Sequence, residues 1–263
     1  MPHSIRMFTR LLAVAALGAI ASPCYADTFM DDMGPRSDGS RAWGLGVGAE
    51  YAASPYRADT TSRTKALPVF YYNSDTLHWL GTTLDYKLPV AGPLSFTLRA
   101  EYGLGDAYKA SDSPYFQGMP NRNGSLWLGG TATWRNPVAN MRLEFLNATG
   151  QSKGERVEWR VEHRFHLDRL SITPHLATTW DSSKYVDYYY GVAATEATAV
   201  RPFYAGKATT EIEGGVSMLY HLDRHNSVYL DVAERRRGSG ITNSPLVDRA
   251  SDPVATIAYL YMF

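Results

Sequence analysis

Cysteine is nearly missing from this chain of 263 residues, because Cys24 is the only one. A lone cysteine cannot form an internal disulfide, which excludes a small domain held together by a disulfide framework. A surplus of either charge is missing as well, since 26 lysines and arginines balance 26 aspartates and glutamates. Nucleic-acid-binding proteins show a basic surplus, so the balance predicts no nucleic-acid partner.

Long apolar runs are also missing. After residue 26 no stretch approaches the length of a membrane-spanning helix. Before it, the sequence has the order of a secretory signal peptide: Arg6 and Arg10, then the short apolar stretch 11–21, then small residues up to Ala26. We therefore expect cleavage between Ala26 and Asp27, which leaves a mature chain without cysteine and with a net charge of about −2.

Two other interpretations of this N-terminal segment are weaker. A lipoprotein would carry its lipid on Cys24, but Pro23 precedes that residue and the usual leucine is lacking. A short buried helix would not need the complete order of charged, apolar and small residues. The expected division is a signal peptide at 1–26, an N-terminal extension at 27–40 and one domain at 41–263.

Recognisable enzyme signatures are scarce. The sequence contains no G-x-x-x-x-G-K and no H-E-x-x-H motif. The glycines of GLGVG at 44–48 lie inside an alternating run, where thin inward packing is expected rather than a dinucleotide loop. His163 and His166 would face opposite sides of a strand, and His221 and His225 flank a turn, so no metal or cofactor is expected. A Ser/His/Asp site assembled across strands stays open, since such sites are recognised by geometry.

In the mature chain, apolar and polar residues alternate with a period of two. In LSFTLRAEY (94–102), Leu94 and Phe96 alternate with polar residues, and the stretches 141–147 and 157–165 repeat the pattern. The strands drawn this way lie at about 42–51, 64–73, 77–88, 94–102, 126–135, 141–147, 157–165, 170–180, 208–220, 227–236 and 254–263. These are eleven, whereas a closed bacterial barrel has an even number, so one strand is merged or missed and 10 or 12 is expected.

Strand length separates two all-β folds. A β-sandwich also alternates, but typical strands have about 5–6 residues. Strands of about nine to eleven residues suit a tilted crossing of a bilayer. Aromatic residues near strand ends, as in interfacial girdles, favour the same fold: they are Trp43, Tyr51, Tyr71, Tyr72, Tyr102, Trp127, Trp134 and Trp180. The sequence predicts an all-β fold, a transmembrane antiparallel β-barrel of 10–12 strands, with lipid as its first partner.

The polar face of these strands predicts a charged lumen. Its members carry both signs: Arg99, Glu101, Arg142, Glu144, Glu158, Arg160, Glu162 and Arg164. Directly opposed strands could pair Arg with Glu across the ladder. Balanced pairs indicate a structural polar filling of a narrow lumen, and the alternative is a selective conduit for small solutes.

The last ten residues, VATIAYLYMF, alternate to the end of the chain. Ile257, Tyr259, Tyr261 and Phe263 would share the lipid-facing side of a last strand that closes against the first. This ending resembles the signature by which outer-membrane barrel proteins are recognised for assembly. The stretch YVDYYYGV at 185–192 is also unusual, and we expect an aromatic belt with loop packing rather than a surface that grips a partner.

Several segments resemble the MipA/OmpV family of MltA-interacting outer-membrane proteins, and the likeness covers nearly the whole mature chain. The segments are WGLGVGAEYAASPY (43–56), LPVFYYNSDTLHWLGTTLDYKL (67–88), LRAEYGLGDAYKASDSPYFQGM (98–119), YVDYYYGV (185–192), ITNSPLVDR (241–249) and AYLYMF (258–263). The loop residues that carry it are Asp112, Ser113, Pro114, Gly118, Tyr188, Tyr189, Tyr190, Gly191, Ser244, Pro245 and Leu246. Phe116 and Met119 stand where the family usually has leucine, and we expect neither to change the fold.

The resemblance implies an outer-membrane barrel in a Gram-negative bacterium and no catalytic residue. It further implies a scaffold that brings a murein lytic transglycosylase together with a penicillin-binding synthase. A narrow channel is the alternative function, and an enzyme housed in the barrel is the third.

Overall fold

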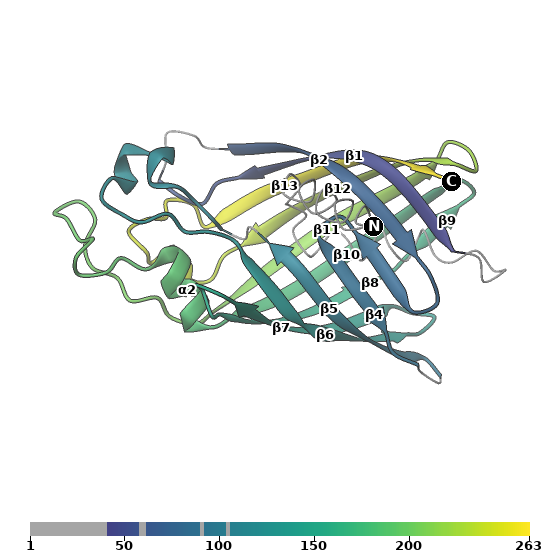
Figure 1. The fold of residues 1–263 in the computed structure, drawn as a ribbon, viewed down its shortest axis with the longest axis horizontal. Helices are drawn as coiled ribbons and strands as arrows, with labels where there is room; N and C mark the ends of the chain where they lie inside the picture. The colour runs from purple at the N-terminus through teal and green to yellow at the C-terminus, as the bar shows by residue number, and fades with distance from the viewer. Residues whose placement is uncertain (1–40, 58–61, 90–91, 104–105) are drawn as a thin grey trace, which may run out of the picture.

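The computed structural model describes residues 41–57, 62–89, 92–103 and 106–263. The predicted signal peptide, its cleavage site and the extension at 27–40 lie outside these residues. What is described forms an elongated barrel of tilted strands (Figure 1).

The strands follow one another around the barrel in chain order. They are β1 (Ala42–Ala53), β2 (Ser62–Asn73), β3 (Leu77–Leu80), β4 (Thr83–Lys87), β5 (Leu94–Gly103), β6 (Ser125–Arg135), β7 (Asn140–Thr149), β8 (Glu155–Glu162), β9 (Phe165–Leu167), β10 (Leu170–Asp181), β11 (Thr209–His221), β12 (Asn226–Arg236) and β13 (Ser251–Met262). The described loops contain four short helices: η1 (Ala110–Asp112), η2 (Pro114–Phe116), α2 (Ser183–Tyr190) and α3 (Ser239–Thr242).

The sheet closes on itself. Strand β13 pairs antiparallel with β1, from Gly44 opposite Met262 to Ala52 opposite Val254. Strands β8 and β9 both pair with β10 and together form one interrupted barrel strand. The described strands therefore make a closed antiparallel barrel of twelve, which confirms the predicted fold class. Closure pairs the backbone polar groups along the first and last strands, which an open sheet would leave unpaired.

The predicted single strand at 77–88 is wrong, and this accounts for the odd count. The chain reverses after β3 at Gly81, whose φ of +56° lies in the left-handed region that glycine adopts easily. Strand β4 then runs back beside β3, with Leu80 opposite Thr83. The resulting hairpin is the shortest part of the described barrel wall.

The short hairpin leaves part of β2 at an edge. The Gly81 amide donates to the Phe70 carbonyl, and β3 goes no further along β2. Residues 62–69 pair with β1 but with no other strand among the described residues. Pro68 lies on this edge, and it faces the β3 side because it shares the parity of Phe70. A proline, which has no backbone N–H to donate, fits such a position.

The two ends of the barrel differ in their connections. At one end the strands are joined at 74–76, 88–93, 136–139, 168–169 and 222–225, and we call this the short-turn end. At the other, the long-loop end, the connections are 54–61, 104–124, 150–154, 182–208 and 237–250. Figure 1 shows α2 and the long loops gathered at one end and the C-terminus at the other.

Large apolar side chains cover the outward face of the wall, as alternation requires. Exposed examples are Trp43, Val47, Leu98, Leu143, Trp159, Leu176 and Ile257. Two of the expected girdle aromatics point the other way, since Tyr71 and Trp127 are buried on the inward face. Neither was distinguishable by type from its outward neighbours. In the described part of the chain, no helix is both long and apolar enough to cross a bilayer.

Candidate functional site

The barrel interior is crossed by a chain of ion pairs that centres on Arg99. Its guanidinium binds Asp85, directly opposite on β4, through two contacts of 2.8 Å. It also donates to Glu144, which lies two strands away on β7. The intervening inward position on β6 is Gly129, opposite Arg99. The guanidinium thus reaches diagonally past β6 to Glu144, which lies opposite Thr131.

The β7–β8 register differs from the expected pairing of Arg with Glu. Arg142 lies opposite Arg160, and Glu144 opposite Glu158, so like charges face each other. The ion pairs form diagonally instead, with Arg142 Nη2 at 3.3 Å from Glu158 Oε1. Long side chains reach diagonal neighbours on the same face of a ladder, which relieves the repulsion between directly opposed groups.

A second group of ion pairs is centred on Arg160. Arg160 contacts Glu158 at 3.4 Å and reaches Glu213 at 3.5 Å, across β10, where the small Ala177 lies between them. Glu213 also accepts from Arg235 at 2.9 Å. We call this set the charge belt: Asp85, Arg99, Arg142, Glu144, Glu158, Arg160, Glu213 and Arg235.

Five of the eight predicted lumen charges therefore lie in the belt. Glu101 and Glu162 are buried on the same inward face. Arg164 is half-buried in the break between β8 and β9. Toward the short-turn end the interior contains an apolar cluster, formed by Ala42, Tyr71, Leu80, Leu219, Tyr229 and Leu260.

Loops close the long-loop end with a packed aromatic cluster, which we call the plug. It consists of Tyr56, Tyr108, Phe116, Met119, Trp127, Leu146, Ala148, Tyr185, Val186, Tyr189, Tyr190, Val192, Ile241, Leu246 and Val247. Phe116 stacks on Tyr108 with ring centroids 4.5 Å apart, and Tyr56 stacks on Tyr190 at 5.3 Å. Segments that lie far apart in sequence thus share one core above the belt.

The tyrosine-rich stretch 185–192 shows the expected loop packing but does not form an interfacial aromatic belt. It lies mainly in α2, where the helical spacing places Tyr185 and Tyr189 on one face, 4.8 Å apart. Tyr185, Tyr189 and Tyr190 are buried in the plug. The expected belt is absent because α2 turns these rings inward onto the loops rather than outward.

Arg237 is the polar centre beneath the plug. Its guanidinium contacts Asp106 at 3.3 Å, Glu211 at 3.7 Å, and also Asp252. It donates to the Tyr190 hydroxyl at 2.6 Å, while the Tyr185 hydroxyl donates to Asp106 at 2.8 Å. One arginine thereby joins the 104–124 loop, α2 and three barrel strands or their ends.

The loop groups around Arg237 have shifted protonation equilibria. Burial alone raises the pKa of the Asp106 carboxyl, but Arg237 and the hydroxyls of Tyr190 and Tyr185 outweigh it and hold the pKa well below its usual range. Burial raises the pKa of Tyr185 and Tyr190 well above the ordinary value, so both hydroxyls stay neutral. The site is therefore a fixed ion pair surrounded by neutral phenols.

The resemblance-derived loop residues converge on the plug, although their roles remain predictions. Ser113 caps η2 by accepting from the Tyr115 amide at 3.1 Å, and Ser244 donates to the Tyr190 carbonyl at 2.6 Å. Gly118 has a φ of +83°, which favours glycine. The others are Asp112, which accepts from the Lys109 amide; Pro114, which begins η2; Tyr188, which packs on the plug; Gly191, which caps α2; Pro245, which accepts from Tyr115; and the buried Leu246.

The four residues of the predicted assembly signature share the outward face of β13. Ile257, Tyr259, Tyr261 and Phe263 are all exposed. Phe263 stacks on Trp43 of β1, with ring centroids 3.9 Å apart. The recognition role of these residues stays a prediction.

Ser, His and Asp do meet inside the barrel, but not in the order that nucleophilic catalysis needs. The Ser217 hydroxyl donates to Asp231 at 2.5 Å, and His175 Nδ1 lies 3.8 Å from the same carboxylate. In a triad the imidazole stands between the hydroxyl and the acid. The segment 150–154 reads G-x-S-x-G, a motif that sequence reasoning missed, yet its Ser152 bonds to Ser125 at 3.0 Å in a loop between strands.

The four histidines considered as metal ligands have separate neighbours in the structure. His166 bonds to Ser171 and His221 to Ser227, while His163 packs on Phe165 and His225 on Tyr261. Within the residues that the structure describes, no group of three or more His, Cys, Asp or Glu side chains is placed to hold a metal ion.

Comparisons with known proteins agree with this architecture. The family model described as MltA-interacting protein MipA matches residues 45–263. The chain is 28% identical to outer membrane protein OmpV of Vibrio cholerae over 60% of its length and 62% of that protein. It is 25% identical to outer membrane protein Omp26La of Vibrio anguillarum (82% and 86% covered) and 24% identical to the MltA-interacting protein of Escherichia coli K12 (83% and 89% covered).

Two solved structures resemble the chain at lower identity. The NanC porin has a TM-score of 0.44 at 10% identity and covers 82% of this chain and 98% of its own. An outer membrane channel from Pseudomonas putida F1 has a TM-score of 0.45 at 10% identity and covers 87% of this chain and 99% of its own.

Proposed function

The chain belongs to the family of the MltA-interacting protein MipA, and from this premise we propose that it is a non-enzymatic scaffold of the cell envelope. It is an outer-membrane β-barrel of the MipA/OmpV type. Its relative in Escherichia coli is named for an interaction with MltA. The proposed partner is therefore a murein lytic transglycosylase, and a penicillin-binding synthase is the second.

The filled interior is the observation that carries a scaffold rather than a conduit. The largest fully buried side chains include Arg160 in the belt, Tyr71 in the apolar cluster, and Tyr185, Tyr189 and Tyr190 in the plug. Three successive layers of side chains thus occupy the path along the barrel axis. A scaffold binds its partners on its outer surfaces and does not need an open lumen, whereas a wide pore needs a water-filled one.

The orientation of the barrel in the membrane is inferred from the lengths of the connections at its two ends. Outer-membrane barrels have short periplasmic turns and longer extracellular loops. The short-turn end then faces the periplasm, where the murein and its enzymes lie, and the plug faces outward. The exposed apolar band between the ends is placed in the lipid.

The scaffold is tested with purified components. The detergent-solubilised barrel is mixed with a purified lytic transglycosylase, with and without a purified penicillin-binding synthase, and complexes are separated by size-exclusion chromatography. We expect co-elution with the transglycosylase, and the synthase joins the same complex if both enzymes are brought together. Separate elution of folded barrel and active enzyme would remove the murein role.

The channel alternative is tested in planar bilayers. We expect the protein to be electrically silent, because belt and plug fill the interior. Discrete conductance steps that change on charge reversal at Arg160 or Glu162 would favour the channel instead.

A further inference from the structure

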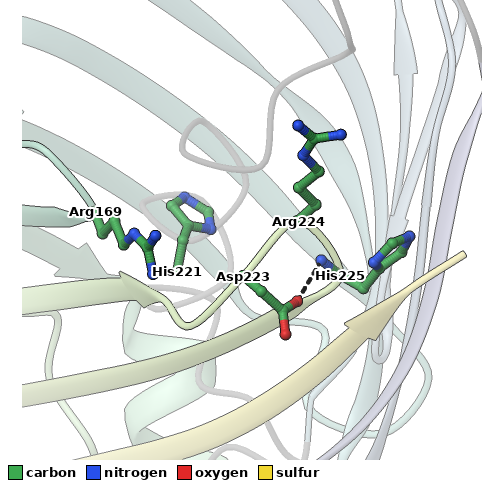
Figure 2. A pocket seen from close by; sticks show the side chains of 5 residues that line it. All are labelled: Arg169, His221, Asp223, Arg224 and His225. Carbon is green, nitrogen blue, oxygen red and sulfur yellow. Dashed lines mark hydrogen bonds between the residues drawn. The ribbon is translucent and has the colours of Figure 1, made fainter.

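The short-turn end contains an open pocket that neither the belt nor the plug uses. It has a volume of about 510 Å³ and is lined by Arg169, His221, Asp223, Arg224 and His225. Figure 2 shows these side chains around the turn between β11 and β12. The turn between β9 and β10 contributes Arg169, whose carbonyl accepts from the His221 amide at 2.9 Å. Pockets of this size accommodate a small organic ligand or a short peptide.

The cations of this pocket are available to a ligand. Arg224 is exposed and forms no ion pair within the described part of the chain. Arg169 is held by one hydrogen bond, from Nη1 to the Leu222 carbonyl at 3.1 Å, so its other guanidinium donors remain open. His221 is fixed by the contact of its Nδ1 with the Ser227 hydroxyl at 2.9 Å.

The single carboxylate of the pocket is engaged by its own turn. Asp223 accepts from the His225 amide at 2.8 Å (Figure 2) and from the amide and side chain of Asn226 at 2.9 and 2.8 Å. These hydrogen bonds, that from His225 foremost, lower the pKa of Asp223 below its ordinary value. Within the described residues Asp223 forms no ion pair with Arg169 or Arg224, so it shapes the turn without occupying either guanidinium.

Other arginines of the described barrel are engaged differently. Arg99, Arg160 and Arg237 are buried and bound to carboxylates. Arg135, at another connection of the short-turn end, is exposed and donates to the Ser95 hydroxyl at 2.7 Å. In this pocket, by contrast, Arg169 and Arg224 come from two neighbouring turns and line the same open space.

We propose that this pocket binds a carboxylate-bearing peptide, namely the stem peptide of murein. The guanidinium fork pairs a carboxylate through two parallel hydrogen bonds, and two such forks suit a chain that carries more than one carboxylate. The volume exceeds what a single phosphate group fills. This inference rests on the proposed function for its orientation, because the pocket must face the periplasm to meet murein.

The experiment measures binding of a defined fragment. The full-length protein in phosphatidylcholine nanodiscs is titrated calorimetrically with a murein disaccharide tetrapeptide and with the same fragment after amidation of its carboxylates. The double variant R169Q/R224Q removes both forks, and R135Q is the matched control at the same end. Heat-dependent migration on gels verifies that each variant forms the barrel.

The expected result is saturable binding that the double variant weakens roughly tenfold or more, as the loss of charge-assisted hydrogen bonds predicts. R135Q binds like the unmodified protein, and amidation weakens binding as much as the double substitution. Absence of binding to folded protein, or equal affinity in R169Q/R224Q, overturns the inference. So does displacement of the fragment by phosphatidylglycerol in the nanodisc, which would reassign the pocket to a lipid headgroup.

The binding and co-elution experiments together distinguish failure of the pocket proposal from failure of the scaffold proposal. If the fragment does not bind but the transglycosylase still co-elutes, the scaffold stands and the pocket assignment falls. If R169Q/R224Q abolishes co-elution while the fragment never binds, the surface belongs to an acidic protein partner and the murein assignment is wrong. If the fragment binds and the enzyme does not co-elute, the pocket stands without the scaffold.

Discussion

The long-loop end and the short-turn end of this barrel use arginine in opposite ways. Arg237 is buried at the first end, where three carboxylates and a phenol surround it. Arg224 is exposed at the second end, on a turn whose one carboxylate, Asp223, accepts hydrogen bonds from the turn itself. The same side chain joins distant loops in one place and faces open space in the other.

The two ends differ in how much stability is lost when an arginine is substituted. Removing a buried cation leaves unpaired carboxylates in a site that excludes water, and that cost is large. When an exposed cation is removed, water takes its place and no buried charge is left unpaired, so the loss of stability is small. Stability should therefore depend on the long-loop end, and recognition of anions on the short-turn end.

The largest expected effect is that of R237A. Asp106, Glu211 and Asp252 would lose their common partner, and breaking such a buried group costs about 3–5 kcal/mol. We expect the loops at 106–124 and 182–208 to become sensitive to protease while the barrel remains folded. The control is R236A, which removes the exposed neighbour, and equal protease resistance in both variants would show that Arg237 does not hold the plug.

Acid should weaken the same end to a smaller extent. The pKa of Asp106 is lowered in the folded protein, so its contribution to stability is complete above the ordinary aspartate value of about 3.9 and is lost as the pH falls below it. Protease resistance of the loops, measured in reconstituted protein from pH 7 to pH 2, should therefore decline only below about pH 4. A decline between pH 7 and 5 would point to another group.

The substitution Y190F tests one hydrogen bond of the plug. It keeps the ring that stacks on Tyr56 and removes the hydroxyl that accepts from Arg237. The expected loss is about 1 kcal/mol of local stability. Hydrogen exchange of α2 measures it, and a loss as large as that of R237A would mean that the ring has also moved.

The smallest effect on stability is expected for R224A at the short-turn end. Exposed substitutions usually change the free energy of unfolding by less than about 0.5 kcal/mol. Urea-dependent unfolding in detergent should give nearly superimposable curves for R224A and the unmodified protein. A shift comparable to that of Y190F would remove the contrast between the two ends.

Much of the barrel was predictable because alternation reports which side of a strand faces lipid. The missed hairpin left a signal as well. Leu77 and Trp79 face outward at odd positions, whereas Leu84 and Tyr86 do so at even ones. The phase slips by one at Gly81, and a slip with a glycine between the two phases indicates a turn.

The interior was less predictable, since pairing within a lumen depends on register. Arg99 reaches Glu144 across β6, where Gly129 lies opposite the arginine, and Arg160 reaches Glu213 across β10, where Ala177 lies between them. A glycine or alanine gives no sequence signal that two charged side chains meet across its strand. The plug was hidden for a related reason, because its members come from loops whose three-dimensional order the local sequence does not specify.

The pairing of β1 with β13 has a consequence for how the barrel forms. A ribosome delivers Ala42 before Met262, so the first strand exists for the whole of synthesis and export without its neighbour. Until the carboxyl end arrives, its exposed edge can recruit any other extended chain. Safe transit therefore requires an escort that shields this edge, and its release must wait for the last strand.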